Sequence, residues 1–158
     1  MAAPNMRKAR EVYGVLLGAL EGMGWKYSVN EDDFTVDYIM KNKDFAINFA
    51  FSLLLEKQLV ELYARLPFEF PEDLLTEAAV AVTAINYKLR DGAFDLKLDG
   101  GTVYFRLTSS YCDTLVGHGL FRYMATASRD TVFGYVNLLY LLAEGEIDID
   151  DFLDDVME

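Results

Sequence analysis

The chain has 158 residues, of which 53% are hydrophobic, 14% aromatic and 25% charged. These proportions exclude intrinsic disorder, collagen-like repeats and a disulfide-stabilised scaffold, and the length fits one domain with a substantial core. The 26 acidic and 14 basic residues give a net charge of −12, which argues against binding to the polyanionic backbone of a nucleic acid.

A single cysteine and a single histidine limit the chemistry that the chain can perform. Cys112 has no partner for an intrachain disulfide, and His118 alone cannot supply a His-pair metal site. No apolar run approaches the roughly 20 residues that cross a bilayer. The basic residues Arg7, Lys8 and Arg10 precede an apolar stretch without a small-residue cleavage site, so we expect an amphipathic helix rather than a signal peptide. These features predict a cytoplasmic protein that does not contact membranes.

The first part of the chain predicts one helix followed by an antiparallel sheet. Apolar residues recur at helical spacing from Asn5 to Met23, and glycines at 22 and 24 end this helix. The apolar period then changes to two, which is typical of strands with one buried face. We expect strands, the first of them short, over the ranges 25–29, 34–40, 45–51 and 58–66.

The second part predicts a helix, a hairpin and a long helical region. Pro71 suits the first turn of a helix whose apolar stripe continues to Leu89, and Gly92 ends it. Residues 94–98 and 103–107 alternate on either side of a glycine-rich turn and predict a hairpin. A helical region then ends near residue 144, with an interruption allowed at 117–119 or near 130. The fold class is therefore α+β, an antiparallel sheet flanked by helices in the order α-β-β-β(-β)-α-β-β-α.

The last long helix is apolar on almost every side between residues 132 and 142. Such a helix needs cover from all directions, and one sheet in a domain of this size does not easily supply it. We therefore expect a second subunit or a bound partner to cover it. The residues predicted for this dimer or partner contact are Val132, Phe133, Val136, Leu139 and Tyr140.

An acidic tail over residues 146–158 follows the predicted domain of residues 1–145. The tail holds seven acidic residues and no base, while Ile149, Phe152, Leu153 and Val156 share one helix face. The acids lack the ligand spacing and central glycine of a calcium-binding loop, so no metal is expected. The tail is predicted to be a short amphipathic helix with a solvated acidic face or one that docks on a basic partner.

Two short apolar segments cannot easily point every side chain into the core. Leu53, Leu54 and Leu55 are consecutive at a strand end, and Phe68 and Phe70 lie in a proline-bracketed connector. Core packing is the simpler interpretation, and a patch that contacts another protein is the alternative. No nucleotide-binding fingerprint is present, so we predict no cofactor and no catalytic residue.

Several short motifs resemble the YbjN-domain family over about residues 6–145. They are the strand 59–66 that ends in Leu66-Pro67, the Asn86-Tyr87 pair of the second helix, and Gly92 with Phe94 at the start of the hairpin. The YbjN domain is similar in architecture to the class I type III secretion chaperones, which are small, acidic homodimers. Those chaperones hold an extended client segment on apolar patches without hydrolysing anything. The resemblance implies the same fold for this chain.

The sequence leaves two functional hypotheses open. The first is a non-enzymatic, homodimeric, chaperone-like adaptor or regulator that holds a client protein on apolar surface patches. The second is a small-molecule-binding or enzymatic domain with a pocket near His118, in which Tyr111, Cys112 and Tyr123 would be further polar groups.

Overall fold

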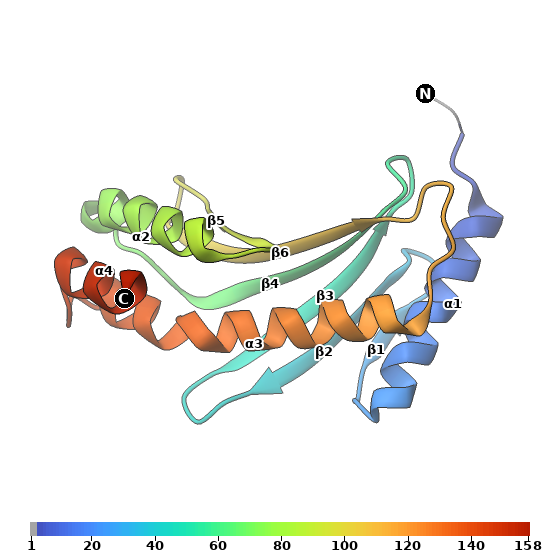
Figure 1. The fold of residues 1–158 in the computed structure, drawn as a ribbon, viewed down its shortest axis with the longest axis horizontal. Coiled ribbons are helices and arrows are strands. Elements are labelled where there is room, and N and C mark those ends of the chain that lie inside the picture. The colour runs from blue at the N-terminus through green and yellow to red at the C-terminus, as the bar shows by residue number, and fades with distance from the viewer. Residues whose placement is uncertain (1–2) are drawn as a thin grey trace.

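The computed structural model describes residues 3–158 as one antiparallel sheet accompanied by helices (Figure 1). Helices and strands follow one another in the predicted order, which confirms the α+β class. The elements are α1 (Met6–Met23), β1 (Ser28–Asn30), β2 (Thr35–Lys41), β3 (Ala46–Leu54), β4 (Leu59–Glu69), the short 3-10 helix η1 (Glu72–Leu74), α2 (Leu75–Lys88), β5 (Ala93–Leu96), β6 (Thr102–Ser110), α3 (His118–Ala143) and α4 (Ile149–Met157).

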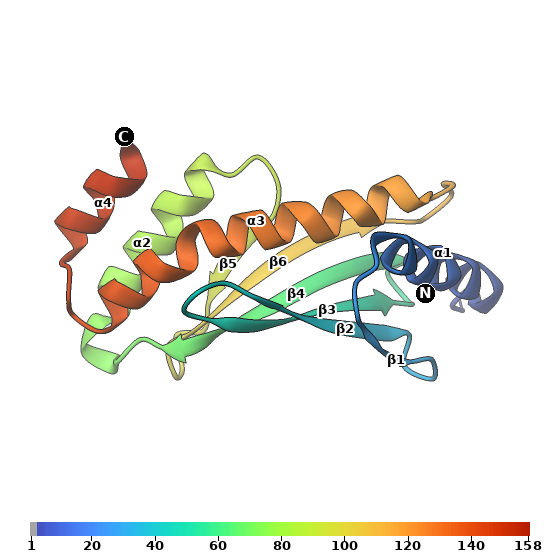
Figure 2. The same ribbon diagram turned by 90° about the horizontal axis from the view of Figure 1, so that it is seen from below.

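The sheet has six strands in the order β1-β2-β3-β4-β6-β5, and every neighbouring pair is antiparallel. Alternate side chains are buried along each long strand, as the period of two in the sequence predicts. The buried side chains of β3 and β4 include Phe49, Phe51, Leu62 and Leu66. No helix within residues 3–158 covers the opposite side of the sheet, which we call the open face (Figure 2).

The helices pack on one face of the sheet and at one end of it (Figures 1 and 2). α3 crosses the covered face and contacts β4 and β6, and α1 packs against the N-terminal half of α3. At the other end, α2 and α4 pack against each other and against α3. The core therefore lies between the sheet and this layer of helices.

The apolar side chains of α3 that face the sheet and the other helices are buried by their own chain. Val132, Val136 and Leu139 are each 0% exposed, and the helix runs without interruption for 26 residues. The expectation that this helix needs a second subunit for cover is therefore wrong. The sheet covers one side of α3, and α2 and α4 enclose its C-terminal half, where Phe152 and Val156 of α4 are also buried.

Several strand boundaries differ from the expected ranges, and β3 and β6 each end three residues later than expected. β1 is limited to Ser28–Asn30, whereas β4 continues through Pro67 to Glu69, where a connector was expected. The register between β4 and β6 shifts between Arg65 and Glu69, and Pro67 lies inside this irregular stretch. A proline has no N–H for a strand ladder, so it is tolerated where the ladder is already interrupted. No helix within residues 3–158 is long and apolar enough to cross a membrane.

Candidate protein-binding site

β3 and β4 separate from each other towards the end of the sheet that carries α2 (Figure 1). Their paired register ends where Phe49 lies opposite Ala64. β3 stays paired with β2 as far as Ala46 opposite Lys41. β4 instead stays beside β6, paired as far as Arg65 and again at Glu69 opposite Thr102, and leads towards α2. The two strands thus leave an opening in the sheet, which we call the split.

A hollow of about 650 Å³ lies at the split. Ala50 and Tyr63 form a cross-strand pair beside it, and the Tyr63 ring stacks on Tyr104 of β6 with ring centroids 4.8 Å apart. Burial raises the pKa of Tyr63 above its ordinary value. The lining residues are Asn48, Ala50, Tyr63, Arg65, Leu66, Pro67, Phe68 and Glu69.

An aromatic cluster lies at the split on the covered face of the sheet. The ring centroid of Tyr140 in α3 lies 5.3 Å from that of Phe45, which precedes β3, and 5.4 Å from that of Phe68 in β4. The Phe45 and Phe68 rings are also 6.2 Å apart, so the three rings form one cluster. Phe68 also lines the hollow, so the cluster supports one of the hollow's apolar walls from the covered face.

Polar contacts fix the turn between β2 and β3 against α3. The Nδ2 atom of Asn137 donates to Oδ2 of Asp44 at 2.7 Å, and Nδ2 of Asn42 donates to Oδ1 of Asn137 at 3.1 Å. Asn42 Oδ1 also accepts from the backbone N–H groups of Asp44 and Phe45. These bonds hold the start of β3 in place and so keep one side of the split in position.

The structure brings together only some of the residues that the sequence singled out. Phe68 and Tyr140 meet at the split, although they come from the two separate predicted sets. Phe70 and Leu53 are buried in the core, whereas Leu54 and Leu55, half-buried, lie at the opposite end of β3. The sequence analysis missed Ala50, although it lies on the open face by strand alternation. Ala50 lies opposite Tyr63 only because of the register between β3 and β4, and the pattern of one strand does not reveal that register.

The side chains of the second hypothesis do not form one site. The His118 imidazole packs over α1, where a Cβ added to Gly18 would lie 2.9 Å from its Nε2 atom. The Tyr123 hydroxyl donates at 3.0 Å to a carboxylate in the loop after α2, Cys112 is exposed, and Tyr111 is buried. Within residues 3–158, no group of three His, Cys, Asp or Glu side chains is placed to hold a metal ion.

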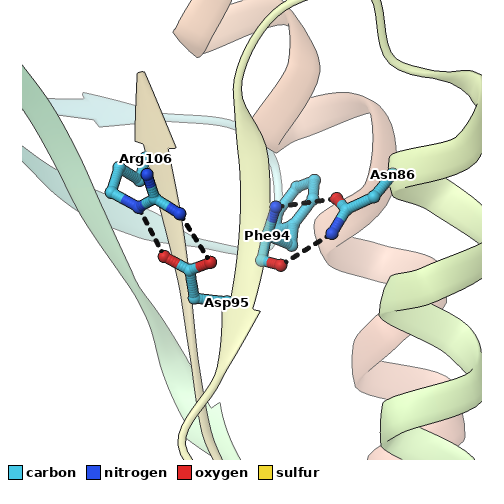
Figure 3. A network of polar contacts seen from close by, with 4 residues as sticks. All are labelled: Asn86, Phe94, Asp95 and Arg106. Carbon is cyan, nitrogen blue, oxygen red and sulfur yellow. Dashed lines mark hydrogen bonds and ion pairs between the residues drawn. The ribbon is translucent and has the colours of Figure 1, made fainter. Parts of the chain in front are cut away.

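The outer edge of β5, the last strand of the sheet, is closed by Asn86 of α2 (Figure 3). The Phe94 N–H donates to Oδ1 of Asn86 at 2.8 Å, and Nδ2 of Asn86 donates to the Phe94 carbonyl at 2.9 Å. Beside them, Arg106 binds both carboxylate oxygens of Asp95 at 2.7 and 3.1 Å. Because the Phe94 edge groups are occupied, this end of the sheet does not offer a free edge for strand addition.

The fold matches solved structures of proteins with very different sequences. YbjN from E. coli, described as a candidate transcription regulator, has a TM-score of 0.58 and 14% identity, covering 82% of this chain and 90% of its own. A chain of the ExsC–ExsE complex has a TM-score of 0.60 and 15% sequence identity, and the match covers 83% of this chain and 95% of that one. A chain of the HopA1–SchA chaperone–effector complex has a TM-score of 0.61 and 12% sequence identity, and the match covers 85% of this chain and 99% of that one. No family model and no curated protein matches the chain at the level of sequence.

This chain has the YbjN fold. The resemblance indicated by the Leu66-Pro67, Asn86-Tyr87 and Gly92 to Phe94 motifs is therefore confirmed for the architecture, which the chaperone SchA shares. The Asn86 contact with Phe94 gives one of these motifs a physical reason, because it joins α2 to the edge of the sheet. At 12–15% identity, the likeness concerns the fold, and function has to be argued from the surface.

Proposed function

We propose that this chain is a non-enzymatic, chaperone-like adaptor or regulator that binds an extended segment of a client protein at the split. The observation that carries the proposal is the hollow beside strand segments that have a partner on one side only. Residues 46–48 of β3 pair with β2 but not with β4. An extended segment would hydrogen-bond to this free edge and place an apolar side chain in the hollow near Ala50 and Tyr63.

The similar solved structures support a protein-binding role. Two of them are complexes of two proteins, and one of these is a chaperone bound to its effector. The bonds of Asn86 to the outward N–H and carbonyl of Phe94 remove the β5 edge as an alternative place of strand addition. The net charge of −12 favours a client with basic residues near its apolar segment, and opposes nucleic acid as a partner.

Replacing Ala50 with glutamine is expected to reduce client binding at least about tenfold while the protein stays folded. The longer polar side chain would fill the hollow, whereas Ala50 is only half-buried on the open face, so little packing is lost. The measurement is quantitative mass spectrometry of proteins that co-purify with the tagged full-length chain from its native cells. Thr108→Gln, which adds the same side chain to an exposed position of β6, serves as the matched control. Equal client recovery with both variants would contradict the assignment of the split.

Homodimerisation is the second part of the proposal. The residues predicted for it in α3 offer little surface, because Val132, Val136 and Leu139 are fully buried and the Phe133 and Tyr140 rings pack against Phe49 and Phe68. A second copy would therefore contact other parts of the surface. Light scattering at micromolar concentration is expected to give about twice the protomer mass of 17.9 kDa, and a uniform monomer would remove this part of the proposal.

A further inference from the structure

A second hollow, of about 660 Å³, lies between α2 and α4 and is formed by none of the residues of the split. Three large apolar side chains remain exposed in it: Val80 is 42%, Tyr87 81% and Met157 53% accessible to solvent. The lining residues are Thr76, Ala79, Val80, Thr83, Ala84 and Tyr87 of α2, with Leu153 and Met157 of α4. We call this surface the α2–α4 groove.

The surface of the α2–α4 groove is mostly apolar. Its α2 side follows a single helix stripe in which Ala79, Thr83 and Ala84 have small side chains that allow another helix to approach closely. The Thr83 hydroxyl donates to the Ala79 carbonyl at 2.7 Å, so its hydrogen-bonding capacity is used within α2. α2 has 14 residues, equivalent to about 21 Å, which would accommodate three to four turns of a docked helix.

The α4 side of the groove carries uncompensated negative charge. Asp150 and Asp154 are exposed, and each lies three positions before a groove residue, Leu153 or Met157, on the same side of the helix. No ion pair within residues 3–158 involves either carboxylate. Lys88, the basic residue of α2, is already bonded to the Val156 and Glu158 carbonyls at the end of α4.

We propose that the α2–α4 groove binds a short amphipathic helix of a partner protein, with apolar residues along one side and lysine or arginine beside them. The apolar side chains would cover Val80, Tyr87 and Met157, and the basic ones would meet Asp150 and Asp154. The exposed carboxylates of this rim favour a basic helix as the occupant. The tail of residues 146–158 would thus act as one wall of a binding site, in addition to covering α3.

The experiment titrates the full-length chain with two labelled helical peptides of about 14 residues, one made of leucine and lysine and one in which glutamate replaces each lysine. Fluorescence anisotropy is expected to show the lysine peptide binding at least about tenfold more tightly than the glutamate peptide. Val80→Lys and, separately, Tyr87→Lys should weaken the lysine peptide at least about tenfold, because both add positive charge and polarity to an exposed apolar floor.

The acidic rim is tested with two double variants, each of which removes two negative charges. Asp150→Asn with Asp154→Asn should weaken binding by about threefold or more, whereas Asp32→Asn with Glu56→Gln, in two turns of the sheet, should leave it unchanged. Ala50→Gln should also leave it unchanged, which separates this proposal from the one concerning the split. Equal binding of the two peptides, or an equal effect of the two charge pairs, would overturn the inference. Light scattering in which Val80→Lys converts a dimer to a monomer would assign the groove to a second copy instead.

Discussion

Replacing Gly101 with alanine is expected to lower the free energy of unfolding by about 4 kcal/mol. Gly101 has a φ of +75°, and a Cβ added there would lie 2.1 Å from the Phe70 carbonyl oxygen, an atom of the backbone that cannot rotate away. The Phe70 N–H also donates to the Gly101 carbonyl at 2.8 Å. The substitution would therefore strain the β5–β6 turn and push apart the contact that fixes the end of β4.

Gly100→Ala is the matched control for this prediction. Gly100 also has a positive φ, +103°, but an added Cβ would have no atom within 4 Å. Its expected cost is about 1–2 kcal/mol from backbone strain alone. Urea unfolding followed by circular dichroism measures the free energy of unfolding of both variants. An equal decrease in the two would show that the contact of the added Cβ with the Phe70 carbonyl does not destabilise the protein. Because Phe70 follows the β4 side of the split, Gly101→Ala should also weaken client binding.

Much of the sheet could be predicted because its physical signal is local. The alternation of Ile47, Phe49 and Phe51 with polar or small residues follows directly from the two-residue period of a strand with one buried face. The second helix could be placed because Pro71 immediately precedes its first turn and its apolar stripe ends at Leu89. These signals depend only on residues that are close together in the sequence, so they can be recognised without the tertiary structure. Gly92 does not end the helix as expected, because the C-cap is Leu89 and Gly92, with a φ of +77°, lies in the loop before β5.

The cover of α3 and the split could not be predicted, because both depend on contacts between distant segments. Whether Val136 is exposed depends on where α2 and α4 fold back, and nothing in its neighbours along the chain encodes that. The separation of β4 from β3 after Ala64 is likewise set by the path of β4 towards α2. Pro67 was the one local sign of irregularity, and it indicated a connector rather than an opening in the sheet.

Val136→Asp is expected to prevent cooperative folding, whereas Val80→Asp should lower the free energy of unfolding by about 1 kcal/mol or less. The two valines lie in helices and differ in their surroundings, since Val136 is 0% and Val80 42% exposed. A carboxylate at Val136 would be buried among apolar side chains without a partner, at a cost of several kcal/mol out of a total stability of about 5–15 kcal/mol. At Val80 the carboxylate would stay in water and cost mainly helix propensity.

The same pair of variants distinguishes a core helix from a dimer helix. If α3 used Val136 to contact a second copy, Val136→Asp would give a folded monomer with a native circular dichroism spectrum and half the mass in light scattering. The burial of Val136 within one chain predicts loss of the thermal unfolding transition at every protein concentration, because the lost packing is intramolecular. A folded Val136→Asp protein would mean that the sheet, α2 and α4 leave more of α3 accessible than they do here.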